Sequence, residues 1–167
     1  MFLKTEKAEI PMKLVFQLST ELRRDPERVA KIQALTKDAS RPSMGYKGMY
    51  GLYNSEEWWE NIRNGSMPSQ YVSGVIQFVG HAGQEGNDTN SFVLLLDDGS
   101  TRFESIYCNI RRDMKFFRVG CRVDIFSVFD PPKVTKPLSP GAERSKIVIE
   151  MAVSTMPVAS IIEEIET

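Results

Sequence analysis

The segment 109–122 holds the residue types best suited to binding an anionic polymer. It carries five cations against a single acid, Asp113, which gives a local charge of +4. Phe116 and Phe117 lie between these cations. Cationic side chains follow phosphates and aromatic faces stack on bases, so this composition is typical of a single-strand nucleic-acid site. The five cations are Arg111, Arg112, Lys115, Arg118 and Arg122.

A structural role explains the same segment equally well. A short helix that plugs a barrel would bury Met114, Phe116 and Phe117 and leave the arginines in solvent, because long cationic side chains keep their charged ends in water. The exposure of the two phenylalanines distinguishes the two explanations. The net charge of −1 also lacks the basic excess of a dedicated duplex-DNA-binding protein.

Nucleophilic chemistry has few candidates, because the chain has one histidine, His81, and two cysteines, Cys108 and Cys121. A catalytic set would have to use His81, and nothing in the spacing favours one. In a reducing compartment the cysteines are expected to be buried free thiols. The ligands are too few and too far apart for a structural zinc site. We predict no catalytic, metal-binding or cofactor-binding residue, and keep an enzyme that uses His81 as a minor alternative.

Two further motifs have structural explanations. Asp97 and Asp98 offer oxygen ligands for a divalent cation, but a hairpin turn needs the sequence Asp-Asp-Gly-Ser for its backbone geometry alone. The glycines of 45–51 are spaced as in a phosphate-binding loop, yet the Gly-Lys-Ser/Thr ending and the preceding buried strand are missing. The sequence therefore predicts a turn at 97–100 and an ordered aromatic loop before residue 54.

Five strand-like runs follow one another between residues 71 and 153. In the first run Val72, Ile76 and Phe78 share one parity, which is the alternation of a half-exposed strand. The second run is apolar throughout, from Phe92 to Leu96. A continuous apolar run predicts burial on both faces, one inside a barrel and the other beneath N-terminal helices. The five runs are 72–82, 91–96, 101–107, 122–129 and 147–153.

The N-terminal part predicts two short helices. Asp25 and Pro26 form a helix start, because the carboxylate caps free N–H groups and proline fits the first helical position. A second helix starts with Asn54 as its cap and presents Trp58 and Trp59. The two tryptophans either pack on the barrel or form a surface patch for a partner. The apolar run from Met12 to Leu18 fits a strand or a helix, and its length does not decide between them.

The order of the strand-like runs, with a long glycine-bent first strand, resembles the OB barrel, a five-stranded partly open Greek-key barrel. An SH3-like barrel or a β-sandwich would give a similar string of strands. We expect a mainly β fold in which two short helices cap an OB-like barrel. Residues 1–70 would form the helical extension, 71–155 the barrel and 156–167 a tail in which 158–165 make one or two helical turns.

The composition is ordinary for a soluble globular protein, with 41% hydrophobic and 26% charged residues among 167. No run approaches the ~20 apolar residues of a membrane helix. Charged residues and Pro11 interrupt the first twenty positions, which spoils a signal-peptide core. A cytoplasmic location is therefore the default expectation.

Two classes of function remain besides the enzyme. The preferred one is a non-enzymatic binding module for single-stranded nucleic acid or another anionic polymer, since the resemblance places the connection after the third strand beside the binding cleft. Its site would consist of Arg111, Arg112, Lys115, Arg118, Phe103 and Tyr107. The alternative is an interaction or assembly protein that binds a protein partner or a second copy of itself through exposed aromatics. Its site would consist of Tyr46, Tyr50, Tyr53, Trp58 and Trp59.

Overall fold

The computed structural model describes residues 1–81, 89–134 and 146–158. They fall into two compact units. Unit 1 combines Met1–Gln17, Tyr71–Phe126 and the described residues from Glu150 onward, and unit 2 combines Leu18–Gln70 with the described residues of Ser127–Ile149. Within these ranges, no helix has the length and apolar character needed to cross a membrane.

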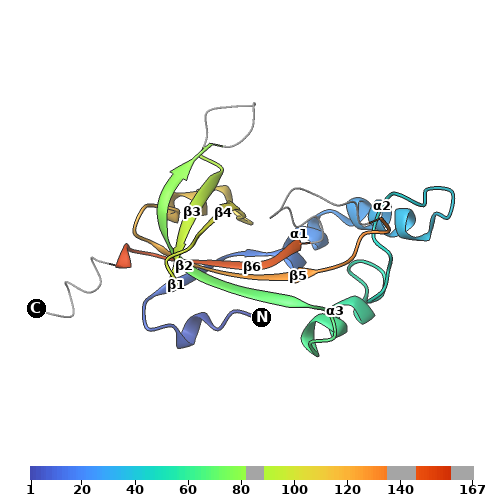
Figure 1. Cartoon of the computed structure of the whole chain (residues 1–167), viewed down its shortest axis with the longest axis horizontal. Helices are drawn as coiled ribbons and strands as arrows, with labels where there is room; N and C mark the ends of the chain where they lie inside the picture. Colours follow the sequence, from blue (N-terminus) through green and yellow to red (C-terminus); the bar gives the residue numbers. More distant parts are fainter. Residues whose placement is uncertain (82–88, 135–145, 159–167) are drawn as a thin grey trace, which may run out of the picture. The chain divides into compact units, whose positions relative to one another are not determined.

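The strands form one open sheet of six antiparallel strands in the order β1-β6-β5-β2-β3-β4 (Figure 1). The mainly β class predicted from the sequence is confirmed. The five-stranded OB-like barrel is wrong in its strand number, and no pairing of β1 with β4 closes the sheet in the described part of the chain. The strands are β1 Met12–Gln17, β2 Ser69–Gly80, β3 Ser91–Leu96, β4 Thr101–Ser105, β5 Arg122–Phe129 and β6 Lys146–Ser154.

The additional strand is β1, in the apolar run that fitted a strand or a helix. It pairs antiparallel with β6, from Met12 opposite Ser154 to Gln17 opposite Glu150. The helix α1 (Leu18–Arg24) follows at once. The run is therefore a strand because of a partner at the far end of the chain, which no local pattern reveals.

The helix α2 (Pro26–Lys37) begins as predicted. Asp25 caps it by accepting a hydrogen bond from the backbone N–H of Arg28 at 3.1 Å, and Pro26 occupies the first helical position. At the other end, the ammonium group of Lys133 donates to three backbone carbonyls of the chain that leaves the helix. A cation at this end neutralises the partial negative charge of the helix terminus. The three acceptors are the carbonyl oxygens of Leu35, Asp38 and Arg41, at 2.5, 3.0 and 3.2 Å.

The helix α3 (Glu56–Arg63) begins one residue later than predicted. Its cap is Ser55, whose hydroxyl accepts from the backbone N–H of Trp58 at 3.2 Å. Asn54, the predicted cap, has a φ of 63°, in the left-handed region that asparagine tolerates better than most residues. Its side chain instead accepts from the indole N–H of Trp59 at 2.7 Å.

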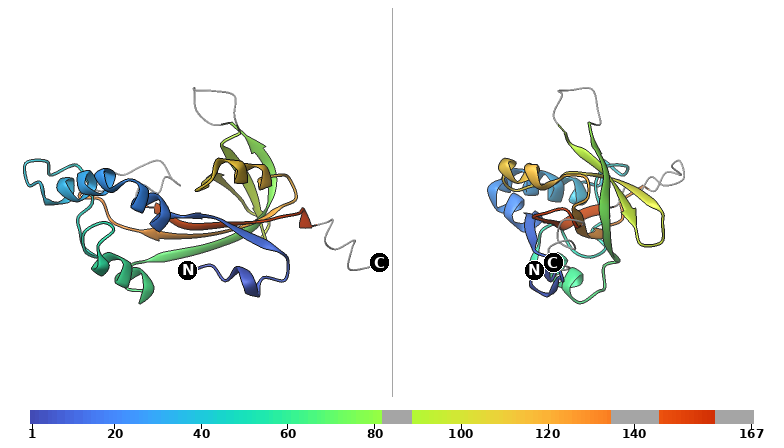
Figure 2. Two further views of the ribbon diagram at one scale, coloured as in Figure 1. Left: turned by 180° about the vertical axis from the view of Figure 1, so that it is seen from behind. Right: turned by 90° about the vertical axis from the view of Figure 1, so that its left-hand side faces the viewer.

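In unit 1 the strands β2, β3 and β4 pack one face against the short 3₁₀ helix η2 (Arg111–Phe116) and the residues after it. Phe92 and Leu94 of β3 are buried on this face, and the ring of Phe92 lies 5.4 Å from that of Phe117. We call this the inner face and the opposite one the outer face. Figure 2 shows η2, in gold, on one side of the three strands.

Three predicted segments extend beyond the described residues. They are the connection 83–90, the loop 134–143 and the helical tail 158–165, of which the structure describes residues 89, 90, 134 and 158.

Candidate functional site

The cationic segment forms a short helix that packs on the inner face of unit 1. Phe117 is buried there, and Phe116 is half-buried with the ammonium groups of Lys13 and Lys115 each 5.2 Å from its ring centre. Asp113 is buried and accepts from Lys13 at 2.7 Å. The phenylalanines are thus part of the packing, as the structural explanation of this segment requires, and neither offers an open face to a base.

The exposed cations line a shallow hollow beside this helix. Arg111 and Lys115 border a cavity of about 320 Å³ together with Val79, Met114 and Phe117. Arg112 and Arg118 are also exposed, and Arg118 donates to the backbone carbonyl of Thr155 at 3.1 Å. The structure therefore brings Arg111 and Lys115 to one hollow, where the one aromatic among the described lining residues, Phe117, is buried.

The two aromatic residues predicted to join these cations lie elsewhere in unit 1. Phe103 projects from the outer face of β4, opposite to the side on which η2 packs. Tyr107 packs against Phe16, with ring centres 5.2 Å apart. The predicted ligand site is therefore not assembled as one surface.

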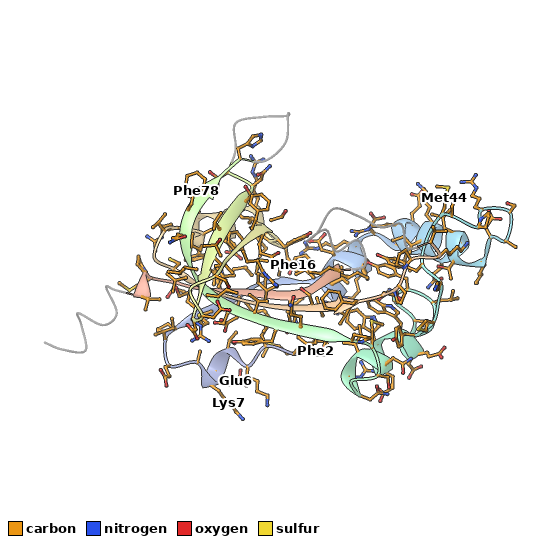
Figure 3. The ribbon with its side chains drawn as sticks, viewed as in Figure 1. Phe2, Glu6, Lys7, Phe16, Met44 and Phe78 are labelled. Carbon is orange, nitrogen blue, oxygen red and sulfur yellow. The ribbon has the colours of Figure 1, made fainter. Side chains whose placement is uncertain are left out.

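Phe78 of β2, Val93 of β3 and Phe103 of β4 form a row across the outer face. The register pairs Phe78 with Val93 and Val93 with Phe103, and residues directly opposite one another project from the same face. Phe78 is 62% exposed and Phe103 61%, and Figure 3 shows Phe78 projecting outward from β2. Leu95, two positions after Val93 on the same face, is 38% exposed. A contiguous exposed apolar surface of this kind is a candidate for binding.

Phe78 reaches the outer face through an irregularity in the β2–β3 register. Between Ile76 and Phe78 the strand β2 advances two residues while β3 advances one, so that Gln77 is the extra residue of a β-bulge. Ile76 is buried and Phe78 is in solvent. The predicted shared face of these two residues is therefore wrong, because the bulge reverses the alternation beyond it.

The predicted burial of β3 on both faces is also wrong. Phe92 and Leu94 are buried, Val93 is half-buried and Leu95 is exposed. The apolar run is covered on its inner face alone by described residues. An apolar outer face left in solvent is the main feature of unit 1 that the sequence did not indicate.

The neighbouring strand β5 is covered on the same side of the sheet by the N-terminal segment. Phe2 stacks on Phe126 with ring centres 4.8 Å apart and planes 9° apart, and Leu3 is buried. Next to it Arg122 donates to Asp124 at 2.9 and 3.1 Å, and this hydrogen bonding raises the pKa of Arg122. A pocket of about 320 Å³ separates the segment from this ion pair.

The predicted partner-binding aromatics lie in unit 2, and two of them are buried. Trp58 is 0% exposed and Tyr53 is buried against it, with ring centres 5.0 Å apart. Tyr46, Tyr50 and Trp59 are half-buried. The loop can therefore present to a partner only parts of these last three side chains.

Trp58 also holds a buried carboxylate. Its indole N–H donates to Oδ2 of Asp130 at 2.9 Å, whereas Oδ1 is buried and has no hydrogen-bond partner among the described residues. Burial raises the pKa of Asp130, and the hydrogen bond from Trp58 opposes this rise. The pair is part of the core of unit 2.

A family model described as immunity protein RhsI2 matches residues 12–154. The chain belongs to this family. A search of curated proteins finds no match. The matched range includes the six strands and three α-helices of the described residues.

Membership of the RhsI2 family overturns the preferred functional prediction. Single-stranded nucleic acid is wrong as the ligand, because the family is one of immunity proteins. The buried Phe117 and the half-buried Phe116 agree with this correction, since single-strand binding depends on exposed aromatic rings. The protein-partner alternative agrees with the family better, and self-dimerisation has no support from it.

Metal and thiol chemistry have no assembled site in the described residues of this RhsI2 family member. Among them, no group of three or more His, Cys, Asp or Glu side chains is placed to hold a metal ion. His81 is exposed, and both cysteines are free. Cys121 is buried, and burial raises the pKa of the half-buried Cys108 to about 11, with a further contribution from Asp113.

We expect both thiols to react slowly with a disulfide reagent such as DTNB. At pH 8 a thiol with the raised pKa of Cys108 has roughly 100-fold less thiolate than one with the ordinary value, and the thiolate is the reactive form. Labelling of the native chain should therefore be slower than labelling in urea by about that factor for Cys108, followed at 412 nm. Equal rates in the two conditions would contradict the burial of the thiols.

Proposed function

We propose that this protein binds a toxin protein of the Rhs type and neutralises it by forming a stable complex. The observation that carries the proposal is the match of the immunity protein RhsI2 model to residues 12–154. The exposed apolar row on unit 1 supports it, since a surface of this kind is typical of a protein interface. The cytoplasmic location expected from the sequence stays a prediction.

Binding by a protein surface is also consistent with the chemistry of the chain. The described residues contain no cluster of side chains suited to binding a metal ion. The pKa of Cys108, the less buried of the two cysteines, is raised. We therefore propose that the protein protects by binding the toxin and not by chemically modifying it. The aromatic loop of unit 2 stays a second candidate surface, through Tyr46, Tyr50 and Trp59.

Co-expression tests this function. Cells that produce the Rhs toxin of the same organism should stop growing alone and grow when this chain is produced with it. The purified pair should elute together in size-exclusion chromatography. An unrelated toxin serves as the control and should not be neutralised. If the chain neither restores growth nor co-elutes with the Rhs toxin, the proposed function is wrong.

A further inference from the structure

We infer that the outer face of β2, β3 and β4 is the surface on which the toxin docks, an inference that rests on the proposed function. The face is centred on the row of Phe78, Val93 and Phe103, with Leu95 beside it. The occupant would be a protein surface with an apolar centre that covers this row. The composition, the backbone geometry and the charges of the face favour a toxin protein over a second copy of this chain.

The composition of the face is that of an interface centre. None of the side chains that the register directs outward from β3 and β4 is charged, although charged residues make up 26% of the chain. Interface centres are depleted in charged residues and enriched in aromatic ones. The outward residues are Ser91, Val93, Leu95, Thr101, Phe103 and Ser105, of which Ser91 is buried.

The backbone of β2 is shaped to expose Phe78. The bulge at Gln77 turns this side chain away from the core that Ile76 enters. A Cβ at Gly80 would lie 2.7 Å from Cε1 of Phe78, so the ring lies over this glycine on the surface of the strand. Bulges that re-aim a side chain are common beside functional sites. Exposure of Phe78 is thus built into the strand by the bulge.

The apolar run of β3 also supports docking on the outer face. A strand that is apolar at every position is typical of burial on both faces, yet only the inner face, with Phe92 and Leu94, is buried here. The N-terminal segment covers β5, which is separated from β3 by β2, through Phe2 and Leu3. The outer face of β2 to β4 therefore continues a surface that is already covered on one side, and a bound protein would complete its cover.

Two exposed carboxylates at one end of the face indicate which charges should lie beside the apolar centre of the toxin's docking surface. Asp97 and Asp98 are exposed in the turn between β3 and β4. Both carboxylates are ionised at neutral pH, and hydrogen bonds from the hydroxyl and N–H of Ser100 lower the pKa of Asp98 below its ordinary value. Complementary charge across an interface increases the association rate. The docking surface of the toxin should therefore carry Lys or Arg beside an apolar patch.

A double variant tests the docking face. Phe78→Ser with Phe103→Ser removes the two most exposed rings and buries no new polar group, because both side chains are in solvent. We expect the Kd for the purified Rhs toxin, measured by surface plasmon resonance, to rise by about 100-fold or more, as for the loss of two central aromatic contacts. Val119→Ser is the matched control, since Val119 is 57% exposed in unit 1 and belongs to neither candidate surface, and its Kd should stay within about threefold of the parent value.

The outcomes separate this inference from the proposed function. If the parent chain binds the toxin and the double variant binds it within threefold of the parent Kd, the docking face is wrong and the function stands. If the parent chain itself does not bind, the function fails. Light scattering of the chain alone checks for a second copy on the face: a dimer that the double variant dissociates would overturn the toxin as occupant. Circular dichroism should show the double variant to be folded like the parent.

Discussion

Trp58→Ala should lower the free energy of unfolding by about 3–5 kcal/mol, the range for removing a buried tryptophan from a packed core. Trp58 is 0% exposed, and its ring lies edge-on to those of Tyr53 and Trp59, with centres 5.0 and 4.9 Å away. The substitution leaves a large apolar cavity in unit 2. It also removes the single donor to Asp130, whose other oxygen already has no partner among the described residues. Urea unfolding followed by circular dichroism measures the loss.

Trp59→Ala is the matched control for this prediction. Trp59 carries the same ring on the same helix but is half-buried, and its indole N–H binds the side chain of Asn54 at the surface of the loop. Trp59→Ala should lower the free energy of unfolding by less than half as much as Trp58→Ala does. Equal losses for the two variants would show that the burial of Trp58 does not decide the stability of unit 2.

Trp58→Phe separates the hydrogen bond from the packing. This variant keeps most of the apolar volume and leaves Asp130 without a donor. The folded-state pKa of Asp130 is raised, so its favourable contribution is present below its ordinary value and is lost as the pH rises through the folded pKa. Without Trp58 the pKa rises further, so the loss of stability relative to the parent should grow from pH 4 to pH 8. A pH-independent difference between Trp58→Phe and the parent would contradict this account.

Local signals in the sequence predicted most elements of the fold. Asp25 and Pro26 start α2, and the turn at Asp97 and Asp98 joins β3 to β4, because capping and turn chemistry depend on adjacent residues. The identity of β1 was left open, since its partner β6 lies at the far end of the chain. The five-stranded OB-like barrel missed the sixth strand for the same reason, and the sheet of the described residues is open, with β1 and β4 at its edges.

The candidate site was harder to predict than the fold. The alternation of β2 placed Phe78 on the same face as Ile76, and a bulge of one residue, which has no marker in the side chains of Ile76 to Phe78, moved it to the opposite face. The cationic segment was predicted to be a binding site because its charge and aromatic content are visible in the sequence. The burial of Phe117 is not, because it depends on packing against Phe92, which is distant in the sequence. The apolar run of β3 did carry the signal, but it indicates burial without indicating whether the covering surface belongs to the same chain.

Glu150→Ala should lower the free energy of unfolding by about 2–4 kcal/mol, because it leaves two backbone N–H groups in unit 1 without their charged acceptor. Glu150 is buried in β6, and its Oε1 accepts from the N–H groups of Phe2 and Leu3 at 2.7 Å each, while Oε2 accepts from the side chain of Gln17 at 3.3 Å. These bonds hold the N-terminal segment on β5. Their loss should also release this segment, so that trypsin cleaves after Lys4 or Lys7 at least tenfold faster than in the parent chain, as expected when a segment opens locally at low free energy.

Glu150→Gln keeps one acceptor oxygen at the same place and is the control. Its loss of stability and its gain in cleavage should be less than half those of Glu150→Ala, since the amide oxygen still accepts from both N–H groups with weaker, uncharged bonds. Phe78 and Phe103 are outside this network, so folded Glu150→Ala should bind the toxin with an unchanged Kd if docking uses the outer face of β2 to β4. A loss of toxin binding in Glu150→Ala, with the variant folded at the assay temperature, would instead place the N-terminal segment in the interface.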